Sequence, residues 1–278
     1  MIAIEGLTYS YPGAEKPALT DFSLKVSEGE LVGILGPNGS GKSTLCYAMA
    51  GFLPAYFRGN IRGSLQVGGL DPIALGPSAL VGTVGFVFQD PFSQITGARF
   101  TVREEVAFGL ENLAISPDEM RPRVEDALRL TGLTHLADRS PFELSGGEQQ
   151  RLALASVLAL QPKILILDEP TSQLDPLGAR QVIEAVDRLT AERKTTVVLV
   201  EQRLEWLAAH ADRAVILSDG RLAAQGRPSE LLTSPALDEF GLRPTRYTLA
   251  ARAAQARGWI AAHHRLPVTL DHAVEFFT

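Results

Sequence analysis

The sequence predicts an α/β fold in which helices cover both faces of a mainly parallel sheet. Three short apolar segments, 31–35, 164–167 and 195–200, each end at a glycine-rich or charged stretch, which is typical of buried parallel strands. Segments with apolar residues at three- and four-residue spacing separate them. This alternation indicates strand–helix–strand units around one sheet.

The remaining elements follow from the same patterns in chain order. We expect strands at 2–4 and 22–26, a helix at 44–50, and further strand-like segments within 61–88. Residues 101 to about 159 have helical spacing throughout, so they predict a helical subdomain. A further helix is expected near 178–192, between the second and third apolar strands.

The composition of the chain changes after residue 221. Four prolines occur there, at positions 228, 235, 244 and 267, and an Ala/Arg-rich segment at 249–262 predicts an amphipathic helix. We therefore expect a main domain at 1–226 and a small accessory region at 227–278, which is a candidate for dimerisation contacts.

Composition and charge exclude several classes of protein. Hydrophobic residues make up 45% of the 278 positions and charged residues 21%, as in ordinary globular proteins. A net charge of −6 disfavours nucleic acid as a partner. The single cysteine, Cys46, allows no intramolecular disulfide and favours a reducing cytoplasm. No apolar run approaches the roughly 20 residues that cross a bilayer, so a role at a membrane would require another chain that spans it.

A glycine-rich stretch at 36–43 predicts a phosphate-binding loop. It matches G-x-x-x-x-G-K-[ST] between a predicted strand and a predicted helix, a context that argues against a chance glycine turn. Lys42 should reach the β- and γ-phosphates of a nucleotide, and Ser43 should bind Mg²⁺. The predicted nucleotide contacts in this stretch are Asn38, Gly39, Ser40, Gly41, Lys42, Ser43 and Thr44.

The apolar strand at 164–167 ends in two carboxylates, as the second half of such a site requires. Asp168 would hold Mg²⁺ directly or through water. Glu169 follows where a base or water-positioning group for attack on the γ-phosphate is needed. A surface Asp-Glu pair closing a strand is the alternative, which the nearby phosphate loop disfavours.

The segment Leu144–Arg151, which reads LSGGEQQR, resembles the signature of the ATP-binding-cassette (ABC) family. The resemblance covers about residues 1–226 with the motifs in the proper order, and implies a P-loop NTPase core of the RecA type. It also implies an antiparallel β edge subdomain and a helical signature subdomain at about 90–158. In the family, Ser145, Gly146 and Gly147 would cap the γ-phosphate of ATP held by a second ATPase subunit, so hydrolysis needs two chains head to tail.

Other positions match the family residue by residue. Tyr11 matches the aromatic that stacks on adenine, with Tyr9 as the lesser candidate and a core tyrosine as the alternative. Gln89 matches the glutamine that reaches Mg²⁺ and the attacking water, and it begins the link to the helical subdomain. The loop at 172–175 matches the one that links the two sites of the dimer, although Gln173 stands where alanine is common.

Gln202 is a departure from the family pattern. It stands after the strand at 195–200, where the family usually has a histidine that contacts the γ-phosphate. Glutamine donates a hydrogen bond but carries no proton or positive charge. We expect ATP binding to survive and hydrolysis to be slower; a tolerated variant is the alternative.

Within the family, the chain is most similar to the ATPases of energy-coupling-factor importers. The resemblance rests on the segments at 88–94, 101–112, 200–205 and 266–270, with 95–96 as a departure. It implies a transmembrane coupling subunit, a substrate-binding membrane protein, a place on the cytoplasmic face of the membrane, and a vitamin or cobalt or nickel ion as cargo. The acidic residues Asp90, Glu104 and Glu105 suggest a basic coupling helix as their counterpart.

Two other functions stay open at this point. A weakly active or regulatory ATP-binding subunit, paired with a more active one, would fit Gln202. A non-transport ABC ATPase that acts on nucleic acid or ribosomes fits less well, because only 56 positions separate Gln89 from Ser145 and the net charge is negative.

Overall fold

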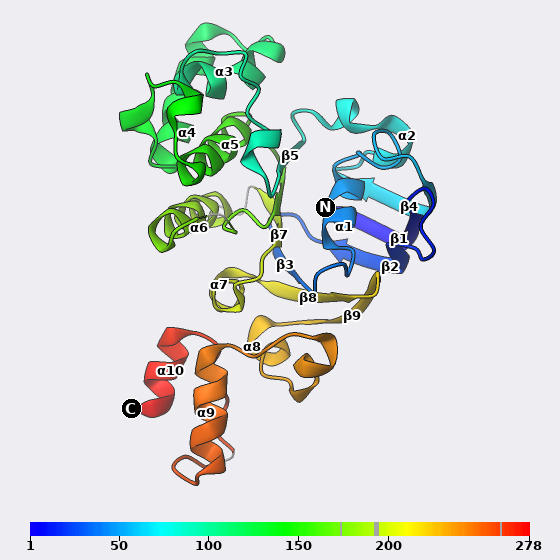
Figure 1. Cartoon of the computed structure of the whole chain (residues 1–278), viewed down its shortest axis with the longest axis vertical. Coiled ribbons are helices and arrows are strands. Elements are labelled where there is room, and N and C mark those ends of the chain that lie inside the picture. The colour runs from blue at the N-terminus through cyan, green and yellow to red at the C-terminus, as the bar shows by residue number, and fades with distance from the viewer. Residues whose placement is uncertain (173, 192–194, 262) are drawn as a thin grey trace.

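The computed structural model describes residues 1–172, 174–191, 195–261 and 263–278, and it contains two sheets (Figure 1). The larger sheet has the strand order β5-β6-β7-β3-β8-β9. Its parallel strands are β3 (Leu31–Leu35), β5 (Val84–Val87), β6 (Ile164–Asp168), β7 (Thr196–Val200) and β8 (Arg213–Ser218). The edge strand β9 (Arg221–Gly226) runs antiparallel to β8. The predicted α/β class is therefore confirmed.

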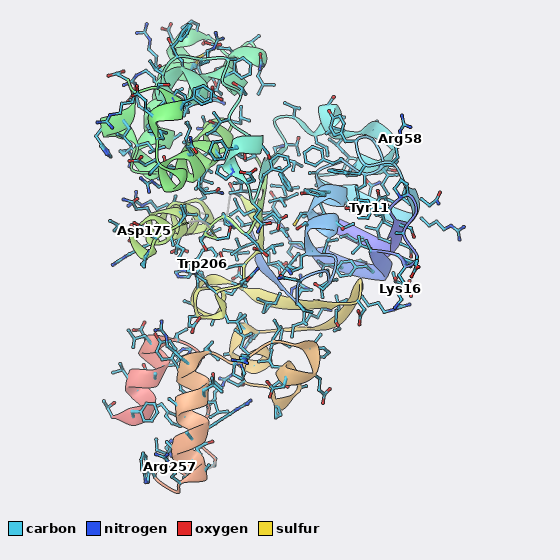
Figure 2. All side chains as sticks on the ribbon, in the orientation of Figure 1. Tyr11, Lys16, Arg58, Asp175, Trp206 and Arg257 are labelled. Carbon is cyan, nitrogen blue, oxygen red and sulfur yellow. The ribbon has the colours of Figure 1, made fainter. Side chains whose placement is uncertain are left out.

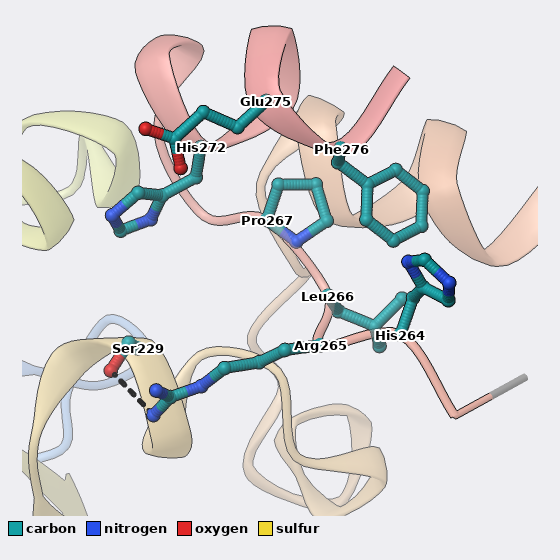
Figure 3. A pocket seen from close by; sticks show the side chains of 8 residues that line it. All are labelled: Ser229, His264, Arg265, Leu266, Pro267, His272, Glu275 and Phe276. Atoms are coloured by element: carbon teal, nitrogen blue, oxygen red, sulfur yellow. Dashed lines mark hydrogen bonds between the residues drawn. The ribbon is translucent and has the colours of Figure 1, made fainter. Parts of the chain in front are cut away.

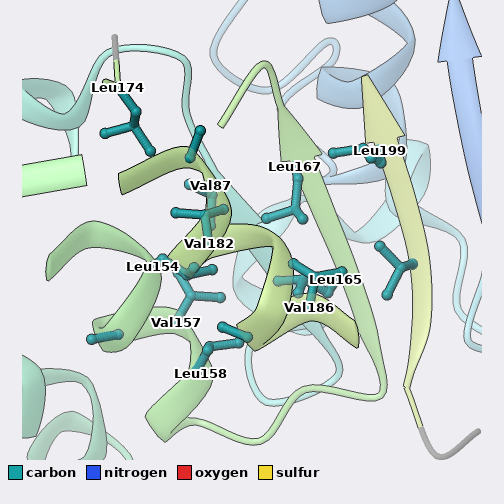
Figure 4. Packing of buried hydrophobic residues seen from close by; sticks show 14 of the residues in the cluster. Val87, Leu154, Val157, Leu158, Leu165, Leu167, Leu174, Val182, Val186 and Leu199 are labelled. Carbon is teal, nitrogen blue, oxygen red and sulfur yellow. The ribbon is translucent and has the colours of Figure 1, made fainter. Parts of the chain in front are cut away.

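The central strands are apolar on both faces because both faces are covered. Every residue of β3, β6 and β7 is buried. One face of β6, with Leu165 and Leu167, packs against α5 (Gly146–Ala159) and α6 (Pro176–Ala191), as Figure 4 shows. The other face of β6 carries Ile164 and Ile166 and packs toward α1 (Lys42–Met49). Alternate residues of β6 therefore face α5 and α6 on one side of the sheet and α1 on the other.

The smaller sheet forms the antiparallel edge subdomain that was predicted. It pairs β1 (Ile2–Ser10) with β2 (Leu19–Val26) on one side and β4 (Asn60–Val67) on the other. Alternate residues of β1 are buried, including Ile2, Ile4, Leu7 and Tyr9, because one face of this sheet packs on the core that contains α1. The subdomain therefore places the end of β1 beside the start of α1.

The helical subdomain lies at the upper left of Figure 1, over α6 and the edge of the parallel sheet. It contains α3 (Val102–Asn112), α4 (Pro117–Leu130) and α5. Thr101 begins α3 with a capping box, in which its side chain accepts from the Glu104 amide and Glu104 accepts from the Thr101 amide. Between α2 (Pro72–Leu75) and these helices the chain crosses through β5, so the subdomain is joined to the core just after that strand.

The accessory region lies at the opposite end of the molecule from the helical subdomain (Figure 1). After α7 (Leu204–His210) and the last strands, it contains α8 (Pro228–Leu231), α9 (Arg246–Ala256) and α10 (Leu270–Phe277). The helix predicted at 249–262 instead spans Arg246–Ala256, so both predicted ends were wrong. Thr245 caps its start through the Thr248 amide, and Gly258 with a φ of 72° ends the turn that follows it. Ala262, at the predicted end, lies outside the described residues.

Within the described ranges, the structure has no helix of the length and apolarity that a bilayer crossing would need.

Gly33 tests how tightly α7 packs on the sheet. A Cβ at this position of β3 would lie 1.5 Å from Cδ2 of Leu207 in α7. We expect Gly33→Ala to lower the free energy of unfolding by about 2 kcal/mol, because overpacking forces the helix outward. Chemical denaturation would measure this, with Gly226→Ala as the control, since no atom lies within 4 Å of the added carbon there. Equal stability of the two variants would contradict this packing.

Candidate functional site

The loop between β3 and α1 has the backbone of a phosphate cradle. Gly36, Gly39 and Gly41 have φ values of 154°, 78° and 104°. The latter two lie in the left-handed region that favours glycine. A Cβ at Gly41 would lie 2.4 Å from the Ala18 carbonyl oxygen, whereas one at Gly39 would meet nothing within 4 Å. The loop is therefore packed on its inner side and open on the side where the start of α1 points.

Lys42 closes the loop on itself. Its Nζ donates to the carbonyl oxygens of Gly36 at 2.9 Å and Pro37 at 3.0 Å, and the residue is buried. The ammonium is therefore already held over the cradle, and a phosphate can replace the two carbonyls as its partner.

The two tyrosines near the site have different environments. Tyr9 is fully buried, and its hydroxyl donates to the carbonyl oxygens of Phe57 and Arg58. Tyr9 is therefore a core residue, and its assignment as a lesser adenine-stacking candidate was wrong. Tyr11 lies half-buried beside α1 (Figure 2). The hydroxyl oxygens of Tyr11 and Thr44 are 3.2 Å apart, and the Tyr9 ring packs edge-to-face against the Tyr11 ring. Its orientation is thus fixed at the mouth of the phosphate loop.

Asp168 is suited to hold a cation. Burial raises the pKa of its carboxyl group above the ordinary value, a hydrogen bond from Ser43 lowers it, and the neighbouring Glu169 raises it. Its Oδ1 is buried without a hydrogen-bond partner. An orphaned carboxylate oxygen beside the Ser43 hydroxyl is the donor set that Mg²⁺ takes with a nucleotide, so the residues present fit that ion. Asp168, Ser43 and Gln89 would hold it.

Glu169 is held by two glutamine side chains. Gln89 Nε2 donates to its Oε2 at 3.0 Å, and Gln202 Nε2 donates to its Oε1 at 2.8 Å. Glu169 has a φ of 49°, a left-handed conformation that costs about 1–3 kcal/mol in a non-glycine residue. Its amide donates to the Val200 carbonyl at 3.0 Å. Glu169 is therefore held by two segments that are distant in sequence, one at Gln89 and one at 200–202.

Most of these groups line one pocket of about 530 Å³, although Asp168 is not among its lining residues. Its lining includes Tyr11, Asn38, Gly39, Gly41, Lys42, Ser43, Thr44, Gln89, Glu169 and Gln202, all predicted from the sequence, and also Ala18, which was not predicted. Ser40 is buried behind the loop, with a hydroxyl that has no hydrogen-bond partner. The pocket brings a phosphate cradle, a carboxylate and an aromatic ring together.

The signature residues do not line this pocket. Ser145 caps α5, and Gly146 and Gly147 form its first turn. Ser145 and Gly146 are exposed, and a Cβ at Gly146 would meet no atom within 4 Å. The Ser145 amide and hydroxyl both donate to Glu148 at 2.8 Å, which holds the pKa of the Glu148 carboxyl below its ordinary value. The start of α5 is thus exposed to solvent and lies outside the pocket around Lys42.

Comparison with known proteins identifies the family of this chain. The family model described as ABC transporter matches residues 19–172, which is more than half of the chain. The chain belongs to the ABC transporter family. It is an ATPase of that family, with the family's mixed α/β fold.

Among its ABC relatives, the energy-coupling factor transporter ATP-binding protein EcfA1 of Levilactobacillus brevis is 44% identical over 246 residues, which are 87% of this chain and 84% of that protein. The structure of cbiO1 from Clostridium perfringens, part of the ABC transporter complex cbiONQ, has a TM-score of 0.73 and 32% identity, and the match covers 92% and 94% of the two chains. A dimeric ATP-binding cassette bound to ADP and Pi has a TM-score of 0.72 and 28% identity, with 82% and 99% covered.

Two further glutamines join the ABC core to its helical subdomain. Gln94 donates to the carbonyl oxygens of Phe86 and Ala153 and accepts from the Phe88 amide. Gln150 of α5 donates to the Phe88 carbonyl at 3.3 Å. Both were quoted in motifs but assigned no role, since sequence alone does not show which amide meets which carbonyl. They connect α5 to the backbone next to Gln89.

One of the acidic residues proposed as docking charges has another role. Glu105 is only 4% exposed, and its two oxygens accept from the amide and hydroxyl of Thr96 at 2.6 and 3.0 Å. The expectation that Glu105 faces a basic coupling helix was therefore wrong, because a buried carboxylate with local donors is unavailable to a partner. Asp90 and Glu104 are exposed, although they also cap the starts of their own helices. Gln173 lies outside the described residues.

A pocket of about 450 Å³ lies apart from the ATP site, in the accessory region (Figure 3). Arg265 crosses its floor and donates to the Ser229 hydroxyl at 3.3 Å, and Phe276 closes one side. In the described part of the chain, no group of three or more His, Cys, Asp or Glu side chains that could hold a metal ion is found.

Oδ1 of Asp168 is buried without a hydrogen-bond partner, so we expect Asp168 to lower the stability of the empty protein while it serves to bind Mg²⁺. Asp168→Asn should stabilise the metal-free, nucleotide-free protein by about 1 kcal/mol at pH 7, because it removes a buried charge. Because the pKa of Asp168 is raised in the folded state, the free energy of unfolding of wild type falls as the pH rises through that pKa. The difference in free energy of unfolding between the variant and wild type should therefore shrink on acidification. Denaturation at several pH values would measure this, and a difference independent of pH would contradict it. Stabilisation by Mg²⁺-ATP should be lost in the variant.

Gln202→His tests the departure from the family pattern. A histidine there can carry a proton and a positive charge beside Glu169, so we expect kcat to rise about tenfold, the equivalent of roughly 1.4 kcal/mol. Wild type should show no inflection from position 202 in its pH–rate profile, whereas the variant should gain one. Steady-state ATPase assays would measure both. An unchanged rate would mean that Gln202 is a tolerated variant.

Proposed function

We propose that this chain is the ATP-hydrolysing subunit of a membrane importer of the energy-coupling-factor type, working as one half of a head-to-tail ATPase dimer. The observation that carries the proposal is the separation of the signature turn from the phosphate loop. The signature turn at Ser145 does not line the pocket around Lys42, and it is exposed to solvent. A second ATPase subunit, identical or related, can bring the two sites together around one ATP.

The residues of the pocket divide the work of hydrolysis. Lys42 and the amides of the loop bind and neutralise the phosphates. Mg²⁺, when bound, supplies charge neutralisation at the β- and γ-phosphates. Glu169 orients the attacking water and accepts the proton of that water. Before nucleotide binds, Gln89 and Gln202 hold the two carboxylate oxygens of Glu169. The second subunit excludes bulk water and adds its signature turn.

Coupling to a membrane partner is proposed through the surface that follows Gln89. Three exposed aromatic residues lie on this part of the chain, Phe92 at 63%, Phe100 at 87% and Phe142 at 67% exposed. A surface with exposed aromatic side chains is typical of a protein interface. We propose that it receives the transmembrane coupling subunit, with Asp90 nearby as an acidic contact. The chain then lies on the cytoplasmic face of the membrane as a peripheral subunit.

The cargo is proposed to be a vitamin or a transition-metal ion, which a separate substrate-binding membrane protein selects. The support is the identity with EcfA1 and the structural similarity to cbiO1. We also propose that the region 227–278 contributes dimer contacts, because Leu270, Val274 and Phe277 form an exposed apolar stripe on α10.

A second candidate function rests on Gln202 alone. A chain without the usual histidine could serve as the weakly active member of a heterodimer. Glu169 and its two glutamine partners are in place, however, so the ATPase reading is favoured.

The head-to-tail arrangement predicts how charge at position 145 affects assembly. In a Glu169→Gln background that prevents turnover, Mg²⁺-ATP should convert the chain to a dimer, alone or with its native ATPase partner. Adding Ser145→Asp should weaken that dimer at least tenfold, about 1.4 kcal/mol, through repulsion of the γ-phosphate. Light scattering with and without ATP would measure this.

Ser116→Asp is the matched control for this experiment. Ser116 is an exposed residue that begins α4 without a side-chain cap bond, so aspartate there is well tolerated. The proposal is supported if the control forms the ATP-dependent dimer and the Ser145→Asp variant does not. Absence of any ATP-dependent dimer, or equal dimers in both variants, would contradict it.

A further inference from the structure

A buried carboxylate holds the backbone at Gln202. Glu201 is only 4% exposed, and its Oε1 accepts from the amides of Gln202 and Arg203, both at 3.0 Å. Its Oε2 accepts from the Thr171 hydroxyl at 2.7 Å, and Thr171 is fully buried. Burying a carboxylate is costly unless donors satisfy it, and here three do. Glu201 therefore fixes the peptide that carries the Gln202 side chain.

Arg203 adds a second connection between the same two segments. Its Nη2 donates to the carbonyl oxygens of Thr171 at 3.5 Å and Leu174 at 3.3 Å. The Leu174 amide in turn donates to the Thr171 carbonyl at 3.1 Å, and the Ser172 amide donates to the Glu169 carbonyl at 3.2 Å. The chain after Glu169 is thus tied back to the residues that flank Gln202.

We propose that Glu201 and Arg203 are positioning residues for ATP hydrolysis, which act through Gln202. Together they hold the Gln202 side chain where its amide donates to Glu169 at 2.8 Å. They also make that position depend on Thr171 and Leu174. This deepens the proposed function and rests on it, because movement of these two residues in the ATPase dimer would reach Glu169 through Gln202.

The bonding pattern dictates how the effects should appear in kinetics. Neither Glu201 nor Arg203 lines the nucleotide pocket. Loss of either should therefore lower kcat and leave KM for ATP within about twofold. A misplaced Gln202 amide loses one hydrogen bond to a charged group, which corresponds to about a tenfold fall in rate.

The test is a double-mutant cycle on the full chain, with its native ATPase partner where it has one. We expect Arg203→Ala and Glu201→Ala each to lower kcat about tenfold, while Glu201→Gln, which keeps an acceptor for the two amides, stays within about twofold. In a Gln202→Ala background, Arg203→Ala should change kcat by less than about twofold, because its route of action is already gone. Thermal denaturation checks folding. Arg203 is exposed, so its variant decides the result if Glu201→Ala is unstable.

Arg246→Ala is the matched control. Arg246 also lies beside α7, where it pairs with Glu205 at 3.7 Å. This ion pair does not involve Thr171 or Leu174, so Arg246→Ala should leave kcat unchanged. The inference would be overturned by equal kcat for Arg203→Ala and Arg246→Ala, or by multiplicative effects of Arg203→Ala and Gln202→Ala on kcat. In either case, an active wild type would leave the proposed function standing. The inference would also be overturned if wild type forms ATP-dependent dimers but Gln202→Ala leaves kcat unchanged. A wild type without ATPase activity would overturn both.

Discussion

The site depends on one carboxylate and the two amides that hold it. Glu169 follows the last residue of β6, and its oxygens accept from Gln89 and Gln202, at 3.0 and 2.8 Å. Each glutamine follows a strand of the same sheet, Gln89 after β5 and Gln202 after β7. Parallel strands end at one edge, so three residues distant in sequence meet there. In the proposed mechanism, hydrolysis, communication with the helical subdomain and the connection to Thr171 and Leu174 all depend on this junction.

The junction also explains why the surrounding structure is built from hydrogen bonds rather than apolar contacts alone. Gln94 and Gln150 hold the backbone at Phe88, next to Gln89. Glu201 accepts from the backbone amides of Gln202 and Arg203, and the Arg203 side chain donates to the carbonyl oxygens of Thr171 and Leu174. A rigid sheet therefore fixes Glu169, whereas its two partners belong to segments that are tied to other parts of the molecule. A displacement of either segment changes what the carboxylate can contact.

The sequence predicted most of the fold and most of the pocket, because the strands are continuous apolar runs and the loops carry dense motifs. Ten residues predicted for ATP line one cavity. The two wrong side-chain assignments share one cause, which is that the sequence alone does not show whether a charged or aromatic residue is buried or exposed. Glu105 and Tyr9 were assigned outward roles, yet tertiary contacts bury both. Glu201 and Arg203 were visible in a motif, but their partner Thr171 lies 30 or more positions away and only the fold reveals it.

The most direct test of this account is a structure of the ATPase dimer with Mg²⁺ and a non-hydrolysable ATP analogue. The γ-phosphate should lie between Lys42 of one copy and Ser145 of the other. The Gln89 amide should have left Glu169 and should face Mg²⁺ and the water, while Gln202 should stay within hydrogen-bonding distance of the carboxylate or the phosphate. A nucleotide enclosed by one copy alone, with both glutamines still bonded to Glu169, would contradict it.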